Sequence, residues 1–342
     1  MPKLPDLLNH NTMSPDPFFL ADPLGASRIP DPCPPACPGT RPGGFCGLRI
    51  EPDCLRIGND STARVGLAAT PDAWFKFLAD LGQLLSLTYN PVATLAILGA
   101  GPTVEDWSDP VLPMTSTALA APNLAEHARL WAFRAQTLAG PSHGLEIEDA
   151  TGTRFQRLCL TGATNHERFE EFVLQHQTPP EQAGVWHSPN NASSARRRSV
   201  LASRVPWLRQ RLAVHCPYVR PLQKNAVIQL LGAATRASFP VRTMLYAPAI
   251  IQGSVWTPEA AVASPRHGDR GARTFASERT VLQIDPVGIG SAWLWTGPCS
   301  CCGETRWSIE VGDHTDGIGL AVLSGNQSLE MEWRELVRRV AP

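Results

Sequence analysis

The 342-residue sequence has no run of about 18 or more apolar residues, so it offers no membrane-spanning helix. It opens on proline- and aspartate-containing sequence rather than on a basic stretch followed by an apolar one, and we therefore expect a cytoplasmic protein that is not membrane-embedded. The motifs G-x-S-x-G, H-E-x-x-H and G-x-x-x-x-G-K are all missing, so no motif in the sequence supports a hydrolase or a nucleotide-binding function. Charged residues make up 18% and the formal net charge is −1, so a generally nucleic-acid-like surface is excluded. Any electrostatic function must be local.

Acidic residues are absent from one long stretch, Gln182 to Pro258. The basic residues within it are Arg196, Arg197, Arg198, Arg204, Arg209, Arg211, Arg220, Lys224, Arg236 and Arg242. Such a one-sided stretch creates a local positive potential suited to a carboxylate-bearing ligand. A solvated, arginine-rich linker is the alternative interpretation. No pattern of stacking aromatics accompanies the arginines, so we expect no nucleic acid as a partner.

Cysteine and proline are concentrated near the start of the chain. Residues 1 to 60 hold twelve of the 32 prolines and no sustained apolar period, which predicts a tail. The tail contains Cys33, Cys37, Cys46 and Cys54, and a second group follows at Cys299, Cys301 and Cys302. Either group could bind a soft metal through thiolates, or remain unligated. Cys159 and Cys216 lie in apolar surroundings and are predicted to be packed.

Strands and helices follow from the apolar periods. A helix is predicted after Thr70-Pro71-Asp72 with Gly82 as its end, and further helices at 166–176, 224–237 and 329–340. Strand–turn–strand units are predicted at 84–98, 145–160, 241–256 and 308–323, and single strands at 129–136 and 291–297.

The second half repeats the order of the first. The spacing is 157 residues from Tyr89 to Tyr246, 162 from Trp131 to Trp293, and 164 from Phe169 to Trp333. We therefore predict an α+β fold made by tandem duplication of an antiparallel β-sheet module flanked by helices. The predicted division is a proline- and cysteine-rich tail at 1–60, a first module at 61–180, and a second module at 181–342 that includes the basic linker.

Two segments carry a resemblance to a known family. "LADLGQLLSLTYNPVA" and "WSIEVGDHTDGIGLAVLSG…EWRELV" resemble the start and the end of the module of the haemin-degrading HemS/ChuX family, over roughly residues 70 to 342. The resemblance implies an intracellular, tandem-module protein that receives haem from an importer and, in some members, degrades it. The arginine of the family's "TRN" is replaced in Thr88-Tyr89-Asn90, and the family's D-x-H-x-F pattern is absent.

The haem expected from this resemblance needs an apolar slot, a basic rim and an axial donor. We predict binding between the second module's sheet and the basic segment, with His187 as the iron ligand and arginines such as Arg209 and Arg211 at the propionates. His176 and His215 are the alternative ligands. The remaining histidines are predicted to be structural or incidental: His127, His143, His166, His267 and His314.

Two functions stay open. The first is haem binding and trafficking in iron acquisition, with or without haem degradation. The second is an interaction or regulatory protein on the same fold that does not bind haem and in which cysteines hold a metal.

Overall fold

The computed structural model describes residues 63–69, 71–100, 117–120, 128–137, 140–149, 151–179, 219–247, 251–263, 271–298, 305–314 and 318–340. Within these ranges the protein is α+β, with two antiparallel sheets and a few helices, as the sequence predicts. None of the helices in these ranges has the length and apolar character that a membrane span requires. The tail at 1–60 and the basic segment up to residue 218 lie outside the described residues.

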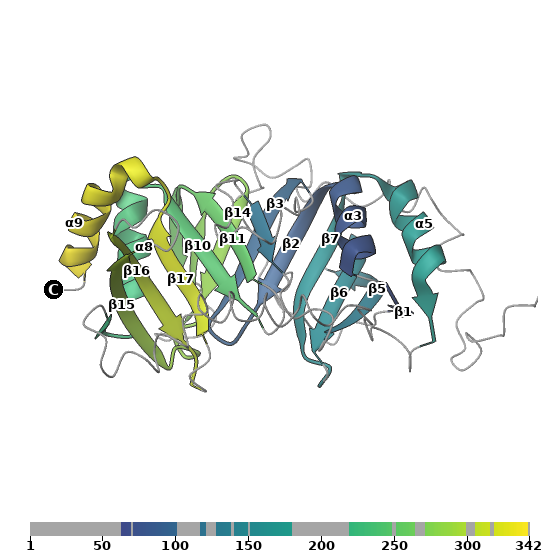
Figure 1. The fold of residues 1–342 in the computed structure, drawn as a ribbon, viewed down its shortest axis with the longest axis horizontal. Helices are drawn as coiled ribbons and strands as arrows, with labels where there is room; N and C mark the ends of the chain where they lie inside the picture. The colour runs from purple at the N-terminus through teal and green to yellow at the C-terminus, as the bar shows by residue number, and fades with distance from the viewer. Residues whose placement is uncertain are drawn as a thin grey trace, which may run out of the picture.

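The first sheet has ten strands among the described residues, in the order β12–β13–β14–β3–β2–β7–β6–β5–β1–β8. Their bounds are β1 (Ala63–Leu67), β2 (Gly82–Tyr89), β3 (Ala93–Ala100), β5 (Ala128–Thr137), β6 (Gly140–Asp149), β7 (Arg154–Thr164), β8 (Gln177–Thr178), β12 (Ala260–Ala263), β13 (Arg273–Ala276) and β14 (Thr280–Ile284). In Figure 1 this sheet forms the centre and the right of the molecule.

The second sheet has seven described strands, in the order β4–β11–β10–β17–β16–β15–β9. Their bounds are β4 (Thr117–Ala120), β9 (Val219–Pro221), β10 (Val241–Tyr246), β11 (Ile251–Trp256), β15 (Ser291–Pro298), β16 (Thr305–Gly312) and β17 (Ile318–Ser324). It occupies the left of Figure 1, together with the C-terminal end of the chain.

Two helices cover one face of the first sheet. They are α3 (Pro71–Asp80) and α5 (His166–His176). Their apolar stripes bury Trp74, Phe77 and Phe172, and the rings of Phe77 and Phe172 stack with centroids 3.8 Å apart. The helix α3 ends before Gly82, whose φ of +78° is a left-handed conformation that glycine adopts without strain. Both helices agree with the sequence prediction.

The second sheet is covered in the same way by α8 (Ala226–Arg236) and α9 (Glu330–Val340), the latter preceded by a short 3₁₀ turn, η4 (Gln327–Leu329). Val227, Leu230 and Leu231 of α8 are fully buried, as their spacing predicts. Trp333 of α9 is fully buried and donates its indole N–H to the carbonyl oxygen of Trp307 at 2.7 Å.

Each half of the chain gives strands to the other half's sheet. From the first half, β4 pairs with β11 of the second sheet. From the second half, β14 pairs with β3, and β13 and β12 extend the first sheet beyond it. The two halves of the chain are therefore joined by main-chain hydrogen bonds within each sheet, which pair the edge strand of each central hairpin. The division at residue 180 stays a prediction about the sequence, since strands cross it in both directions.

Asn90, in the turn between β2 and β3, joins the two halves through its side chain. Its Nδ2 donates to the carbonyl oxygens of Tyr246 at 2.8 Å and of Gly319 at 2.7 Å. Its Oδ1 accepts from the backbone N–H groups of Val92 and Ala93, which holds the turn. A Cβ on Gly319 would lie 2.6 Å from Val92 Cγ2, so glycine is needed for this close approach.

Polar side chains continue the contact between the sheets. Thr88 of β2 donates to the side-chain oxygen of Gln252 of β11, and the hydroxyls of Ser254 and Thr280 lie 3.3 Å apart. All four residues are buried. A buried polar group is stable only when it is paired, so these contacts favour one arrangement of the two sheets over others.

The strands predicted from alternation are confirmed with small changes at their ends, from β2 and β3 to β16 and β17. Strands β1, β4, β8, β9 and β12 to β14 were not predicted. Most are short, and the partners of β4 and β14 lie more than a hundred residues away along the chain. Local periodicity carries little signal for such strands.

We expect Asn90→Ala to lower the free energy of unfolding by about 2–4 kcal/mol, because two interior carbonyl oxygens and two turn N–H groups lose their partner. Urea denaturation measures the change. Asn326→Ala is the matched control, because Asn326 is exposed and its side chain caps only the local turn at Ser328. Equal losses for the two variants would contradict the role given to Asn90.

Candidate functional site

Each sheet has one face that α3, α5, α8 and α9 do not cover. On the second sheet, alternate residues of β10 and β17 point away from the helix-covered core. They form a separate apolar cluster with Ile251 of β11, which consists of Tyr246, Ile251 and Ala321 with Met244 and Leu323 against it. On β15, Ala292 and Leu294 are buried toward the core, and the tryptophans between and after them face the other way. We define the second open face as Arg242, Met244, Tyr246, Trp293, Trp295, Ser308, Glu310, Ala321 and Leu323.

Two tryptophans give the second open face its character. The ring of Trp295 lies back over its own strand, because a Cβ built on Gly297 would fall 2.4 Å from the ring. Trp293 is partly exposed, but its indole nitrogen is buried and has no hydrogen-bond partner. An aromatic surface that lies along a sheet is suited to a flat apolar ligand.

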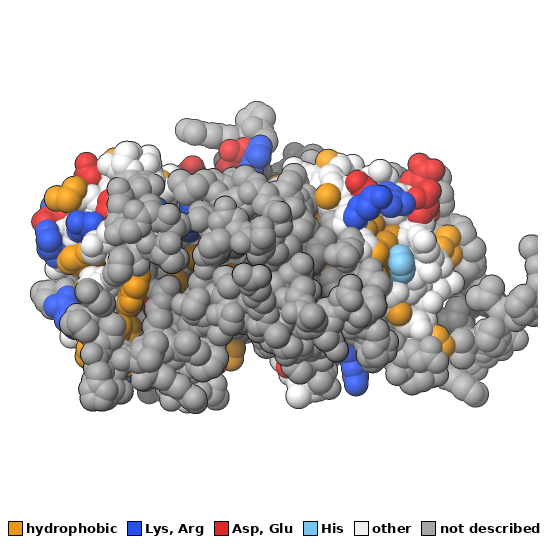
Figure 2. All heavy atoms as spheres, viewed as in Figure 1, with side chains coloured by type: hydrophobic (Ala, Val, Ile, Leu, Met, Phe, Trp, Pro, Cys, Tyr) orange, Lys and Arg blue, Asp and Glu red, His pale blue; other side chains and the backbone are white. Residues whose placement is uncertain are grey.

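Charge on the second open face is sparse. Arg242, from the acid-free stretch, lies opposite Leu323 and Val255 in the register and is partly buried. Glu310 is buried and accepts from the hydroxyl of Ser308 at 3.3 Å. On the side of the molecule drawn in Figure 2, the described charged residues lie mainly toward the two ends, acidic beside basic.

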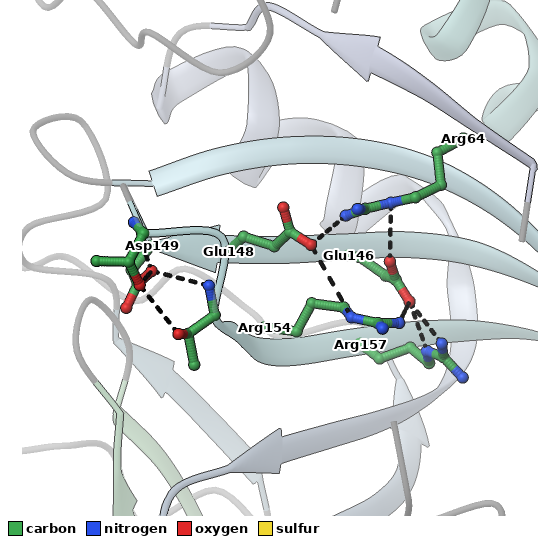
Figure 3. Close-up of polar contacts among 8 residues, drawn as sticks. Arg64, Glu146, Glu148, Asp149, Arg154 and Arg157 are labelled. Atoms are coloured by element: carbon green, nitrogen blue, oxygen red, sulfur yellow. Dashed lines mark hydrogen bonds and ion pairs between the residues drawn. The ribbon is translucent and has the colours of Figure 1, made fainter. Parts of the chain in front are cut away.

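The first sheet also has a face that α3 and α5 do not cover, which we call its open face. Unlike the second open face, it carries a network of buried charged side chains (Figure 3). Glu146 of β6 is fully buried, and its Oε1 accepts from Arg157 Nε at 2.9 Å and from Arg154 Nη1 at 3.1 Å. Its Oε2 lies 3.2 Å from Arg64 Nε. Glu148 binds Arg64 Nη2 at 2.5 Å and lies 3.9 Å from Arg154 Nε.

Aromatic rings lie beneath two of these guanidinium groups. Arg64 Cζ is 4.5 Å from the ring centroid of Trp131, and Arg157 Cζ is 4.5 Å from that of Phe133. Both distances are typical of cation–π contacts. Among the described residues no guanidinium lies over Trp293, which corresponds to Trp131 in the sequence repeat. The chain's own arginines thus cover the aromatic surface of the first sheet, whereas none of the arginines that the structure describes covers Trp293.

No family model matches the sequence, and no curated protein matches it significantly by sequence. Solved structures do match: the heme-degrading enzyme ChuS of Escherichia coli O157:H7 superimposes with a TM-score of 0.66 at 14% identity, covering 84% of this chain and 89% of ChuS. Holo-PhuS, a heme-binding protein from Pseudomonas aeruginosa, superimposes with a TM-score of 0.63 at 18% identity, covering 82% and 87%.

This chain has the fold of the HemS/ChuX-type proteins. The resemblance predicted from the two sequence segments is confirmed at the level of the fold. At 14–18% identity the likeness shows the fold alone and assigns no role to any side chain of this protein.

The three residues predicted to hold haem, His187, Arg209 and Arg211, lie outside the described residues, and so does the alternative ligand His215. The other alternative, His176, is at the end of α5, where Nδ1 lies 3.1 Å from the carbonyl oxygen of Ala68 and the ring contacts Phe172. These contacts belong to the helix side of the first sheet, far in the fold from the second open face.

Other histidines have local roles where the structure describes them. His166 Nε2 lies 3.0 Å from the carbonyl oxygen of Thr161, and His314 Nε2 lies 2.9 Å from that of Val287. His127 and His267 lie outside the described residues. None of the described histidines belongs to the second open face.

Cys159 is buried on β7 and forms no disulfide, so its predicted packing is confirmed. The cysteines of the tail, Cys216, and the group from Cys299 to Cys302 lie outside the described residues. Within the described ranges no three His, Cys, Asp or Glu side chains are placed to hold a metal ion.

Sequence reasoning missed the charge network of the first sheet. The hairpin of β6 and β7 was interpreted only by its apolar residues. Its charged residues are Glu146 and Glu148, at alternate positions of β6, and Arg157, which faces Glu146 from β7. The available signal was the opposite charge of cross-strand neighbours, such as Glu146 and Arg157. Arg64 contributes from β1, which pairs with β5 across 70 residues and was not predicted.

His143, on β6 opposite Arg134, makes stability depend on pH. Burial, and then the charge of Arg134, lowers its pKa from 6.5 to about 4. Between these two pH values the unfolded chain binds a proton that the folded chain does not, so stability is complete above pH 6.5 and falls as the pH drops toward 4. In His143→Gln this contribution is absent, and we expect a smaller loss of the free energy of unfolding between pH 7 and pH 4.5.

Urea denaturation at the two pH values measures this difference. Asn326→Ala is the control, because Asn326 is exposed and has no titratable side chain, so it should leave the slope of stability against pH unchanged. A slope in His143→Gln equal to that of the unsubstituted chain would show that His143 does not carry the effect.

Proposed function

We propose that the protein binds haem against the second open face. The observation that carries the proposal is the surface of Trp293, Trp295 and Met244 with Leu323, which crosses neighbouring strands on the side away from α8 and α9. Haem is a flat, largely apolar macrocycle that needs such a surface. The titles of the two similar structures describe heme degradation for ChuS and heme binding for PhuS, and both support the choice of ligand.

The proposed site also includes basic residues that would pair with the haem propionates. The two propionates need cations, and Arg242 on β10 lies within the second open face. Arg209 and Arg211 precede β9, the edge strand next to β15, and we propose them as further propionate partners. His187 is the proposed axial ligand, since no described histidine is on this face. Bound haem would supply an iron centre, while the chain's own residues bind and orient the macrocycle.

The proposed role is that of a cytoplasmic haem carrier in iron acquisition, which accepts its ligand from an importer. Degradation of haem is a further activity that would require an electron donor. The reciprocal exchange of β4 and of β12 to β14 supports the proposal that the fold arose by tandem duplication, because each half places the strands after its central hairpin on the other sheet. The pairs Trp131–Trp293 and Glu148–Glu310, both 162 residues apart, occupy corresponding strands.

Titration of the full chain with haemin tests the binding. We expect a Soret shift that saturates at one equivalent. Trp293→Ala and Met244→Ala should each weaken binding about tenfold, because each removes apolar contact equivalent to about 1.5 kcal/mol. Met331→Ala is the control for the methionine, since Met331 is 67% exposed on α9, and it should bind as the unsubstituted chain does.

The ligand assignment is tested by the position of the Soret maximum. We expect His187→Ala to move the maximum of the complex and His176→Ala to leave it in place. An unchanged maximum in His187→Ala would show that the axial ligand is wrong while the carrier role stands. If no Soret shift occurs in the unsubstituted chain, the protein has lost haem binding, and an interaction or regulatory protein with cysteine-bound metal becomes the better interpretation.

A further inference from the structure

The charge network on the first sheet does not balance. Arg64, Arg154 and Arg157 contribute three positive charges, and Glu146 and Glu148 contribute two negative ones. A fourth arginine, Arg129, lies opposite Glu148 in the register of β5 and β6 and is exposed. The net charge of the five-residue network is therefore +1.

Hydrogen-bond donors are also in excess. Three guanidinium groups provide about fifteen N–H donors, whereas two carboxylates offer about eight acceptor sites. Glu146 and Arg157 are almost fully buried, but the side chains of Arg154 and Arg64 are 20% and 26% exposed. The surplus positive charge therefore reaches the surface at Arg154 and Arg64, while Glu146 is enclosed beneath them.

A second, independent observation is the hydroxyl group of Tyr89. Leu87 faces Arg157 in the register of β2 and β7, and Tyr89 follows two residues later on the same face, in one cluster with Phe133 and Cys159. Tyr89 is 9% exposed, and its hydroxyl group is buried without a hydrogen-bond partner. Burial raises the pKa of this hydroxyl far above its usual value, and the nearby Arg157 and Arg154 oppose the rise, so the group remains a neutral donor.

A buried donor without an acceptor is destabilising, and a partly buried charge without a counterion is also unfavourable. The surplus positive charge and the unpaired hydroxyl of Tyr89 lie on the same face of the sheet. One oxyanion that accepts hydrogen bonds would pair with both. Arginine forks match carboxylate and phosphate oxygens, and such charge-assisted bonds are among the strongest in proteins.

We propose that the open face of the first sheet is a binding site for a small oxyanion, a carboxylate or phosphate group, held by Arg154 and the hydroxyl of Tyr89. The site is separate from the second open face. It does not depend on haem, because the aromatic rings of Trp131 and Phe133 are already covered by the guanidinium groups of the network.

Isothermal titration calorimetry of the full chain in chloride-free buffer of low ionic strength tests this proposal, with acetate, succinate and inorganic phosphate as probes. We expect saturable binding of at least one probe. Tighter binding of succinate or acetate would identify a carboxylate as the natural group, and tighter binding of phosphate would identify a phosphate. Haemin binding by the variants below should stay as in the unsubstituted chain, which separates this proposal from the haem proposal.

Two variants locate the site. Arg154→Gln removes the surplus charge and leaves two arginines with two carboxylates, so it should weaken anion binding tenfold or more. Tyr89→Phe keeps the packed ring and removes only the hydroxyl, so it should weaken binding about fivefold, as expected for one hydrogen bond. Arg334→Gln is the matched control, because Arg334 is 24% exposed and paired with Glu330 on α9. Absence of saturable heat up to about 10 mM probe, or equal affinity in Tyr89→Phe and the unsubstituted chain, would overturn the proposal.

Discussion

Main-chain pairing between strands from different halves of the chain is the constraint on which the remaining structure depends. The edge strand of each central hairpin, β3 or β11, is completed by a strand from the other half. Asn90 adds side-chain bonds to Tyr246 and Gly319 at the place where the halves meet. Neither sheet could keep this edge paired if the halves separated, so the two open faces hold a fixed relation to each other.

The two open faces carry different side chains on corresponding strands of the same backbone arrangement. Trp131 and Trp293 lie on corresponding strands, as do Glu148 and Glu310. On the first sheet, arginines bind the glutamates and cover the aromatic rings, so the apolar surface is used within the fold. On the second sheet, Glu310 accepts a hydrogen bond from Ser308, and none of the described arginines lies over the ring of Trp293. This difference in side chains, more than any difference in backbone, is why we propose a flat apolar ligand for the second face and a small anion for the first.

The sequence alone predicts the elements whose signal is local. The spacing of Phe169, Phe172 and Val173 determines α5, and alternation on either side of Gly152 determines β6 and β7. The α+β class and the family resemblance at the level of the fold follow from these elements. The strands β4 and β12 to β14 do not follow, because their stability comes from partners in the other half of the chain.

The same limit applies to the site. An arginine-rich stretch is visible in the sequence, but the network of Arg64, Glu146 and Arg157 is complete only when β1 joins the sheet of the β6–β7 hairpin through β5. The cross-strand pairing of Glu146 with Arg157 could have been predicted from the hairpin register, whereas the contribution of Arg64 required the position of β1. In Thr88-Tyr89-Asn90 this chain has Tyr89 where the family pattern has arginine. The structure places Tyr89 on the face of the charge network, and Asn90 joins the two halves by hydrogen bonds.

The position of the haem iron in crystals of the haemin complex, located by its anomalous scattering, tests the central claim most directly. We predict a single iron peak on the side of the second sheet that α8 and α9 leave uncovered, above Trp293 and Met244. An iron peak over the first sheet, or on the helix side of either sheet, would contradict the account.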